Sequence, residues 1–337
     1  MRHYILDKSS LEPKILAIRN LAMPDLQNPI FNDLDKAREA LEKTRWPNGA
    51  YCPHCGNAKK ELIAKVEGVK KSHRAGLYYC NECKGQFTVT VGTVFERSKV
   101  PLTKWWLATH LMSASKKGIS AHQMHRMLGV TYKTAWFMAH RIREAMKDMN
   151  PPAMGGEGSI IEADETYFKD KDIVTKRTKK GKSGHGSKRT IVALVERGGP
   201  VRSFHVERAT TETVRDILLA NASRESKLFT DESRLYTSTG TQFADHDTVT
   251  HSKYEYVRGE VHTNTIEGVF SIFKRGMLGI YQHCGEAHLH RYLAEFDFRY
   301  NNRTALKVSD RERTEKAMKG IEGKRLTYRR LDQSAHA

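Results

Sequence analysis

The chain has 337 residues, enough for a sizeable hydrophobic core and accessory units, so two or three domains are expected. Its 57 Lys and Arg against 39 Asp and Glu give a formal charge of +18, which favours a polyanionic partner such as nucleic acid. No apolar run approaches the roughly 20 residues that span a bilayer, and residues 1–13 lack the apolar core of a signal peptide. We therefore expect a cytosolic or chromosome-bound protein without a membrane partner.

Two Cys-x-x-Cys pairs form the first motif along the chain. Thiolates at this spacing are typical ligands of one tetrahedral zinc ion. The alternative, a pair of disulfides, is disfavoured by a reducing compartment. Residues Leu77–Tyr79 and Gln86–Thr90 are strand-like, so the pattern predicts a zinc ribbon with structural Zn²⁺. The predicted zinc ligands are Cys52, Cys55, Cys80 and Cys83.

A helical pattern follows from Leu102 to Met112, and residues 120–136 then follow the pattern of a helix, a glycine turn and a second helix. Ser120 and Thr131 stand where helix N-caps belong. The pattern predicts a helix-turn-helix that docks on DNA, with an ordinary helical hairpin as the alternative. The side chains predicted to face DNA are Tyr132, Lys133, His140, Arg141 and Arg143. Those predicted to pack inside are Met127, Leu128, Val130, Ala135, Trp136 and Ile142.

A stretch rich in Pro and Gly, from Pro151 to Gly158, cannot continue a helix and marks a linker. Beyond it, the pattern is three strands, a helix, a strand and a late acidic helix, which is the ribonuclease H-like order of an α/β fold. The predicted strands are 159–164, 190–195, 201–205 and 227–230, and the predicted helices are 211–222 and 264–274.

Three acidic positions carry the predicted chemistry. Asp164 and Asp231 close the ends of neighbouring buried strands, where an apolar core tolerates a carboxylate only when it is paired or bound to metal. Asn264, Glu267 and Lys274 are spaced to share one face of the late helix. Such a set can hold two Mg²⁺ or Mn²⁺ ions about 3.5 to 4 Å apart for phosphodiester chemistry, with Lys274 on a phosphate near the cut. The neighbouring acids Glu162, Glu165 and Glu232 are expected to be solvated surface residues.

These residues resemble the zinc-ribbon insertion-sequence transposases with a DDE-type, integrase-like catalytic domain, the ISXO-like transposases. The likeness leaves out only the two ends of the chain. The motifs that carry it, besides the cysteine pairs and the helix-turn-helix, are Trp46–Gly49, Gly92–Phe95, Lys104–Trp106, Glu162–Tyr167, Thr230–Glu232, His262–Gly268, Phe273–Gly276 and Phe296–Asn301.

The resemblance implies a transposase that binds the terminal inverted repeats of an insertion sequence, cleaves the 3' ends and joins them to target DNA. It implies that Asp164, Asp231 and Glu267 are the catalytic acids, followed by the basic Lys274. In parts of the family the third position is described as Asn, which leaves Asn264 as the alternative, although a carboxylate neutralises Mg²⁺ and an amide does not. Two paired DNA ends imply at least a homodimer, in the cytoplasm of a prokaryote and associated with its nucleoid.

Two other functions fit parts of the pattern. One is a DNA-binding regulator with a catalytically inert ribonuclease H-like domain, which the three acids disfavour. The other is a nuclease that acts on RNA in a hybrid, which the DNA-docking helices disfavour. The basic segment 176–189, with seven Lys or Arg in fourteen residues, is predicted to be a loop that contacts phosphate or is merely solvated.

The predicted boundaries follow from these patterns. They are 1–45 for an N-terminal helical segment with an amphipathic stretch at 16–26, 46–98 for the zinc ribbon, 99–150 for the helix-turn-helix, 159–305 for the catalytic domain and 306–337 for a basic C-terminal tail.

Overall fold

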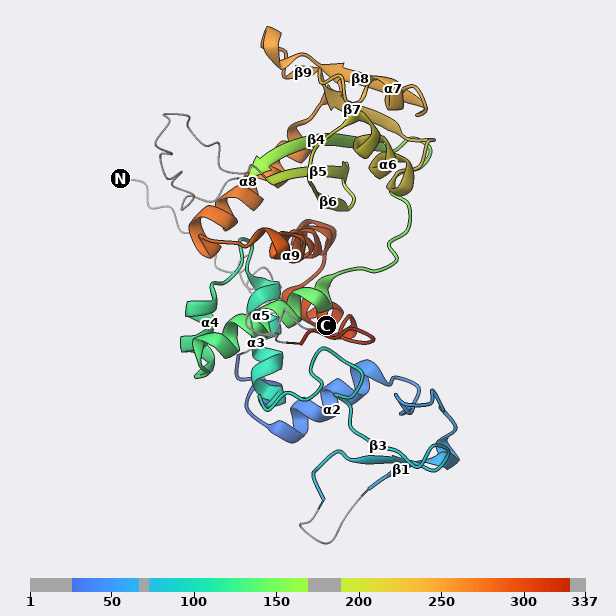
Figure 1. The fold of residues 1–337 in the computed structure, drawn as a ribbon, viewed down its shortest axis with the longest axis vertical. Helices are drawn as coiled ribbons and strands as arrows, with labels where there is room; N and C mark the ends of the chain where they lie inside the picture. Colours follow the sequence, from blue (N-terminus) through green and yellow to red (C-terminus); the bar gives the residue numbers. More distant parts are fainter. Residues whose placement is uncertain (1–25, 67–72, 169–188, 328–337) are drawn as a thin grey trace, which may run out of the picture.

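The fold is seen in a computed structural model, which describes residues 26–66, 73–168 and 189–327. The predicted amphipathic stretch 16–26 and the basic segment 176–189 lie outside these ranges, except for one residue each. Along the long axis, a cysteine-rich part, a helical part and a mixed sheet follow one another (Figure 1). Among the described residues, no helix is long and apolar enough to cross a membrane.

The cysteine-rich part packs on one helix. That helix, α2 (Leu34–Arg45), begins at Asp33, whose side chain accepts hydrogen bonds from two backbone N–H groups of the first turn. Trp46, Tyr78 and Phe87 form an aromatic core beside it, with the rings of Tyr78 and Phe87 stacked at 5.6 Å. The remaining elements here are η2 (Pro29–Phe31), η3 (Lys60–Leu62) and the antiparallel strands β1 (Ile63–Lys65), β2 (Tyr78–Cys80) and β3 (Gln86–Phe87).

The helical part consists of α3 (Leu102–Ala114), α4 (Ala121–Leu128) and α5 (Tyr132–Met146). As predicted, Ser120 and Thr131 cap α4 and α5 through their side chains. Gly129 ends α4 in the left-handed conformation, with φ at 58°, a region that glycine adopts without a steric cost. The helices, caps and turn of the sequence pattern are therefore present.

One more helix, α10 (Asp310–Lys319), packs against α3. Its residues Ala317 and Met318, together with Ile321 just after the helix, join the core of the first two parts. The prediction of a basic tail from residue 306 is wrong here. Ser309 starts α10 with a full capping box, but only two apolar side chains occur in its ten residues. The hydrophobic periodicity was too sparse to indicate a helix.

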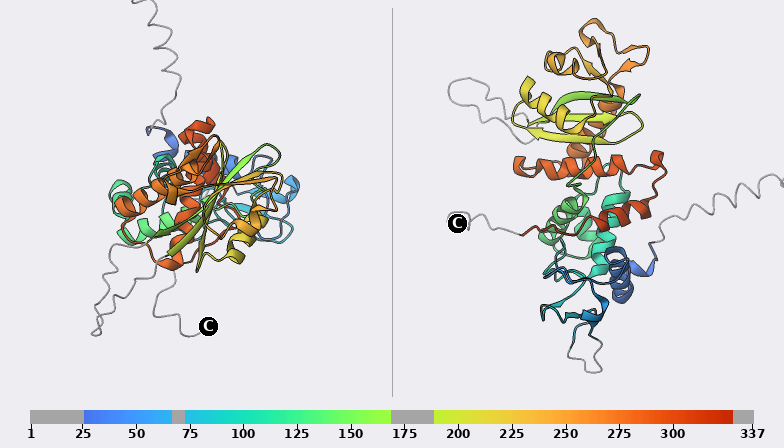
Figure 2. Two further views of the ribbon diagram at one scale, coloured as in Figure 1. Left: turned by 90° about the horizontal axis from the view of Figure 1, so that it is seen from above. Right: turned by 90° about the vertical axis from the view of Figure 1, so that its right-hand side faces the viewer.

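The sheet is the third part, and its strands are β4 (Ile160–Phe168), β5 (Arg189–Glu196), β6 (Val201–Val206), β7 (Lys227–Asp231) and β8 (Asp245–Val249). Their spatial order is β6-β5-β4-β7-β8, with β4 antiparallel to β5 and parallel to β7. Three helices cover it, α6 (Thr211–Asn221), α8 (Asn264–Gly276) and α9 (Leu289–Asn301). The views show the sheet stacked on α8 and α9, with the other parts below (Figure 1, Figure 2).

The alternation of side chains along β5 divides the core in two. Ile191 and Ala193 join a core with α8 and α9, whereas Val192 and Leu194 join one with α6. The predicted order of strands and helices is confirmed, and the chain has a mixed α/β fold.

The edge strand β8 was not predicted, because its sequence Asp-His-Asp-Thr-Val has a single apolar residue, Val249, and therefore no apolar alternation. β4 also extends four residues beyond its predicted end at 164. The other short elements are α7 (Thr237–Gly240), η4 (His251–Lys253), β9 (Val257–Arg258), β10 (Val261–His262), a π-helical turn η5 (Met277–Tyr281), η6 (Glu286–His288) and η7 (Thr304–Leu306).

Candidate catalytic site and cysteine cluster

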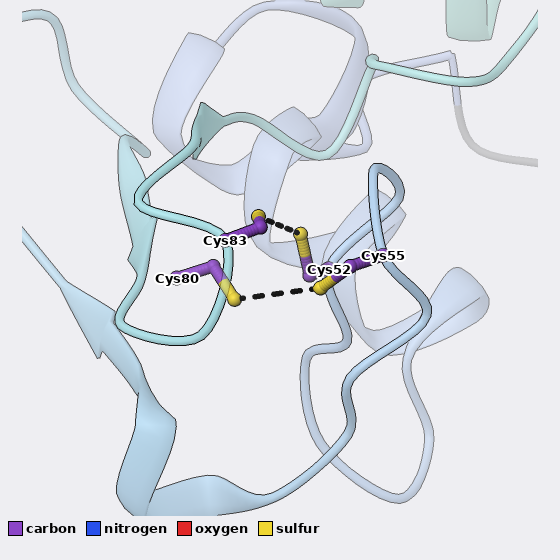
Figure 3. A group of neighbouring side chains, drawn as sticks. All are labelled: Cys52, Cys55, Cys80 and Cys83. Carbon is purple, nitrogen blue, oxygen red and sulfur yellow. Dashed lines mark hydrogen bonds between the residues drawn. The ribbon is translucent and has the colours of Figure 1, made fainter.

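The four cysteines of the two Cys-x-x-Cys pairs converge on one point. Their sulfur atoms all lie within 4.8 Å of one another and form no disulfide (Figure 3). The Sγ atoms of Cys52 and Cys83 are 3.6 Å apart, and those of Cys55 and Cys80 are 3.7 Å apart. Sulfur ligands at about 2.3 Å from a tetrahedral ion are about 3.8 Å from one another, so the cluster fits structural zinc.

The strand register places two acids side by side. Ile160 of β4 lies opposite Lys227 of β7, and Glu162 lies opposite Phe229. Continued for two more residues, this parallel register leads to Asp164 on β4 and Asp231 at the end of β7, and the charge of Asp231 acts on Asp164. Paired residues of neighbouring strands point to the same face of a sheet, which is here the face that carries α8.

The surroundings of Asp164 are acidic. Burial, and then the negative charges of Asp231 and Glu165, raise the pKa of the Asp164 carboxyl to about 8, with a smaller contribution from Glu267. In the part of the chain that the structure describes, neither Asp164 nor Asp231 forms an ion pair with Lys or Arg. A half-buried pair of carboxylates without a cationic partner is the environment that a bound metal cation neutralises.

Glu267 lies at the exposed start of α8, with its side chain 48% exposed. Its Oε1 atom is 3.5 Å from Thr263 Oγ1 and 3.9 Å from His251 Nε2. The charge of Glu267 acts on Asp164, but the three acids do not all come within 4.8 Å of one another, since only the cysteines do so among the described residues. Asn264 is also exposed, and Lys274, two turns further along α8, is half-buried.

Glu162 was expected to be solvated, and this prediction is wrong. Its side chain is fully buried and accepts hydrogen bonds from Arg197 and from the first turn of α8. Glu162 shares a strand face with Asp164 because the two residues are separated by one position. That period of two was the signal in the sequence that could have identified it.

Glu165 was also expected to be solvated and instead accepts a hydrogen bond of 2.7 Å from the hydroxyl of the buried Tyr236. Burial raises the pKa of Glu165 above its ordinary value. Glu232, in contrast, is exposed as expected and accepts hydrogen bonds from Ser252.

Two of the residues predicted to face DNA are exposed at the start of α5. Tyr132 is 43% exposed and stacks on His122 at 4.3 Å, and Lys133 beside it is exposed. Arg141 is half-buried and donates hydrogen bonds to the carbonyl groups of Leu326 and Glu96. The sequence pattern of the helix-turn-helix therefore predicted exposed side chains correctly only in the first turn of α5.

The predicted exposure of Arg143 and His140 is wrong, because the second half of α5 packs on α9. Arg143 Nε donates to Glu295 Oε2 at 2.7 Å. Among the residues predicted to pack inside, Met127 is 49% exposed, which is also wrong. Leu128, Ala135 and Ile142 are buried as predicted, and Val130 and Trp136 are half-buried.

Comparisons with known proteins bear on both sites. Residues 155–301 match the ISXO2-like transposase domain, and residues 33–86 match the transposase zinc-ribbon domain. An uncharacterized protein in the transposable element ISH50 of Halobacterium salinarum is 30% identical over 276 residues, which are 78% of this chain and 90% of the relative.

A solved structure also matches, a simian T-cell lymphotropic virus intasome in complex with PP2A regulatory subunit B56 gamma. The identity is 18%, and the match covers 38% of this chain and 48% of that chain with a TM-score of 0.20. The first domain match spans Asp164, Asp231 and Glu267, and the second spans all four cysteines.

Proposed function

The chain belongs to the family of ISXO2-like transposases, and on that premise we propose that it is the DNA transposase of an insertion sequence. It binds the terminal inverted repeats, cleaves the 3' ends and joins them to target DNA. The observation that supports the chemistry most is the closeness of Asp164 and Asp231, whose charges interact and have no basic partner among the described residues.

Asp164, Asp231 and Glu267 are the proposed ligands of the catalytic metal ions. Two Mg²⁺ or Mn²⁺ ions in such a site activate a water or a 3' hydroxyl and stabilise the leaving oxygen. Glu267 is preferred over Asn264 because it brings a negative charge close enough to act on Asp164. Lys274, on the same face of α8, is proposed to contact a phosphate near the cut.

Recognition of DNA is proposed to use α4 and α5 as a helix-turn-helix, with Tyr132 and Lys133 at the groove. The zinc ribbon supports this surface, and α10 belongs to the same unit because it completes its core. The sheet with α6, α8 and α9 is proposed to be a ribonuclease H-like catalytic domain. Synapsis of two ends requires at least a homodimer, which we expect at the nucleoid of the cytoplasm.

The proposal is tested with purified protein on labelled duplexes that carry the ends of its own element. Cleavage and end binding are measured with Mg²⁺, with EDTA, and in the variant Asp231→Asn. The variant is expected to lose cleavage by roughly 10²–10³-fold or more, as for the loss of other transition-state contacts, and to keep end binding.

The matched control is Asp216→Asn, which changes an exposed carboxylate on α6 with 72% exposure and should leave cleavage unchanged. Equal loss of binding and cleavage in Asp231→Asn would contradict the assignment of Asp231. End binding by wild-type protein without any metal-dependent nicking would instead support the DNA-binding regulator.

A further inference from the structure

The start of α8 is attached to the strand that carries Asp164. Glu162 Oε2 accepts hydrogen bonds from the backbone N–H groups of Thr265 at 2.9 Å and Ile266 at 3.0 Å. Its Oε1 atom accepts from Thr265 Oγ1 at 2.8 Å. N–H groups in the first turn of a helix have no acceptor within the helix, so Glu162 supplies one from β4.

Arg197 completes this attachment from the turn after β5. Its Nε atom donates to Glu162 Oε1 at 2.6 Å. The same guanidinium donates to the carbonyl groups of Glu260 at 2.7 Å and His262 at 2.9 Å, both in the segment that leads into α8. Arg197 therefore binds both the Glu162 carboxylate and the segment that precedes α8.

The two acids of β4 differ in how their oxygen atoms are used. Both oxygens of the buried Glu162 accept hydrogen bonds from inside the fold, and Arg197 balances its charge. Asp164 accepts a single hydrogen bond, from the backbone N–H of Glu165 at 2.7 Å, among the described residues. The hydrogen bonds of Glu162 therefore connect β4 to α8, whereas the carboxylate of Asp164 still has oxygen lone pairs that can bind a ligand.

We propose that Glu162, together with Arg197, is a positioning residue of the metal site. Glu162 connects two of the proposed metal ligands closely, because Asp164 lies two residues after Glu162 on β4, and Glu267 directly follows Ile266 on α8. The attachment fixes the third acid relative to the first. This inference rests on the proposed function, since it assigns the two linked acids to one metal site.

The test is Glu162→Gln in the zinc-loaded, full-length protein. The amide keeps the size of the side chain, but its NH₂ group cannot accept a hydrogen bond, so it loses either Arg197 or the helix N–H groups. Mn²⁺ affinity, measured by titration calorimetry, should fall by about 10- to 100-fold, as for other residues that orient metal ligands. Cleavage should need correspondingly more Mg²⁺ and approach the wild-type rate at saturation.

The control is Asp297→Asn, which changes a carboxylate of the same part that also accepts from a backbone N–H and a hydroxyl, both of Ser203. Its Mn²⁺ affinity should equal that of the wild type. Should Glu162→Gln fail to fold, Thr265→Ala removes one donor to Glu162 and should weaken Mn²⁺ binding several-fold, and unchanged affinity there would overturn the proposal.

The outcomes separate this inference from the proposed function. Wild-type Mn²⁺ affinity in Glu162→Gln, with cleavage intact, overturns the positioning role and leaves the transposase proposal standing. Weakened Mn²⁺ binding in the variant, with no cleavage by the wild type, supports the positioning role and counts against the activity. Equal weakening in Glu162→Gln and Asp297→Asn indicates general loss of structure and also overturns the inference.

Discussion

Glu295, in the interface between α5 and α9, accepts hydrogen bonds from Arg143, Arg299 and Tyr281, whereas Asp164, at the edge of the sheet, lies among other acids. Burial by itself raises the pKa of Glu295, but the charges of Arg299 and Arg143 outweigh it and lower that pKa below its ordinary value. At Asp164 burial and the neighbouring charges act in the same direction, and the pKa rises to about 8.

The difference separates two uses of a carboxylate. Where the chain needs a carboxylate for packing, as at Glu295 and Glu162, it supplies arginine and hydrogen-bond donors itself. Where Asp164 and Asp231 meet, the described residues supply one backbone N–H group to each carboxylate, from Glu165 and Ser233, and no cationic side chain, so neutralisation is left to an ion from solution.

The largest effect is expected at the compensated carboxylate. Glu295→Gln leaves Arg143 and Arg299 buried without a counter-charge, and breaking such a pair costs about 3–5 kcal/mol of unfolding free energy. Urea unfolding measures this loss. The control Glu315→Gln removes an exposed ion pair with Arg311 and should change stability little. Similar small losses in both variants would contradict the role of Glu295.

A buried base without compensation should make the same interface sensitive to acid. Burial, aided by the charges of Arg143 and His288, lowers the pKa of His140 to about 2, and neither ring nitrogen has a hydrogen-bond partner within the described ranges. The folded protein keeps His140 neutral, whereas the unfolded chain binds a proton below about pH 6.5. Stability is therefore complete above that pH and falls as the pH decreases.

The expected loss is roughly 2 kcal/mol between pH 6.5 and pH 5, at about 1.4 kcal/mol for each pH unit. Urea unfolding of the wild type and of His140→Phe, at both pH values, measures it. The variant keeps an aromatic ring against Trp136 but has no group that titrates there. Its unfolding free energy should therefore fall by roughly 2 kcal/mol less than that of the wild type between the two pH values. Identical pH dependence in the two proteins would show that His140 carries a proton in the folded state.

The smallest effect is expected at the acidic edge of the sheet. Asp164→Asn removes a carboxyl group whose charged form is disfavoured by burial and by the charges of Asp231 and Glu165. The metal-free variant should therefore be more stable by roughly 1 kcal/mol and melt about 2–4 °C above the wild type. Saturating Mg²⁺ should raise the melting temperature of the wild type alone. A lower melting temperature for the metal-free variant would mean that Asp164 has a structural partner.

The sequence predicted what depends on local pattern. The cysteine spacing, the caps at Ser120 and Thr131, and the two strands that carry Asp164 and Asp231 were all readable without tertiary contacts. The misplaced residues depend on packing between distant segments. Arg143 meets a carboxylate 152 positions away, and Glu162 meets a helix 103 positions away, so the neighbouring sequence does not show which groups they bind.

The most direct test of the metal site is anomalous scattering from crystals of the zinc-loaded protein grown with Mn²⁺. The account predicts a manganese peak within metal–oxygen bonding distance of the carboxylates of both Asp164 and Asp231. Manganese bound only elsewhere, or a basic side chain seated between the two aspartates, would contradict it.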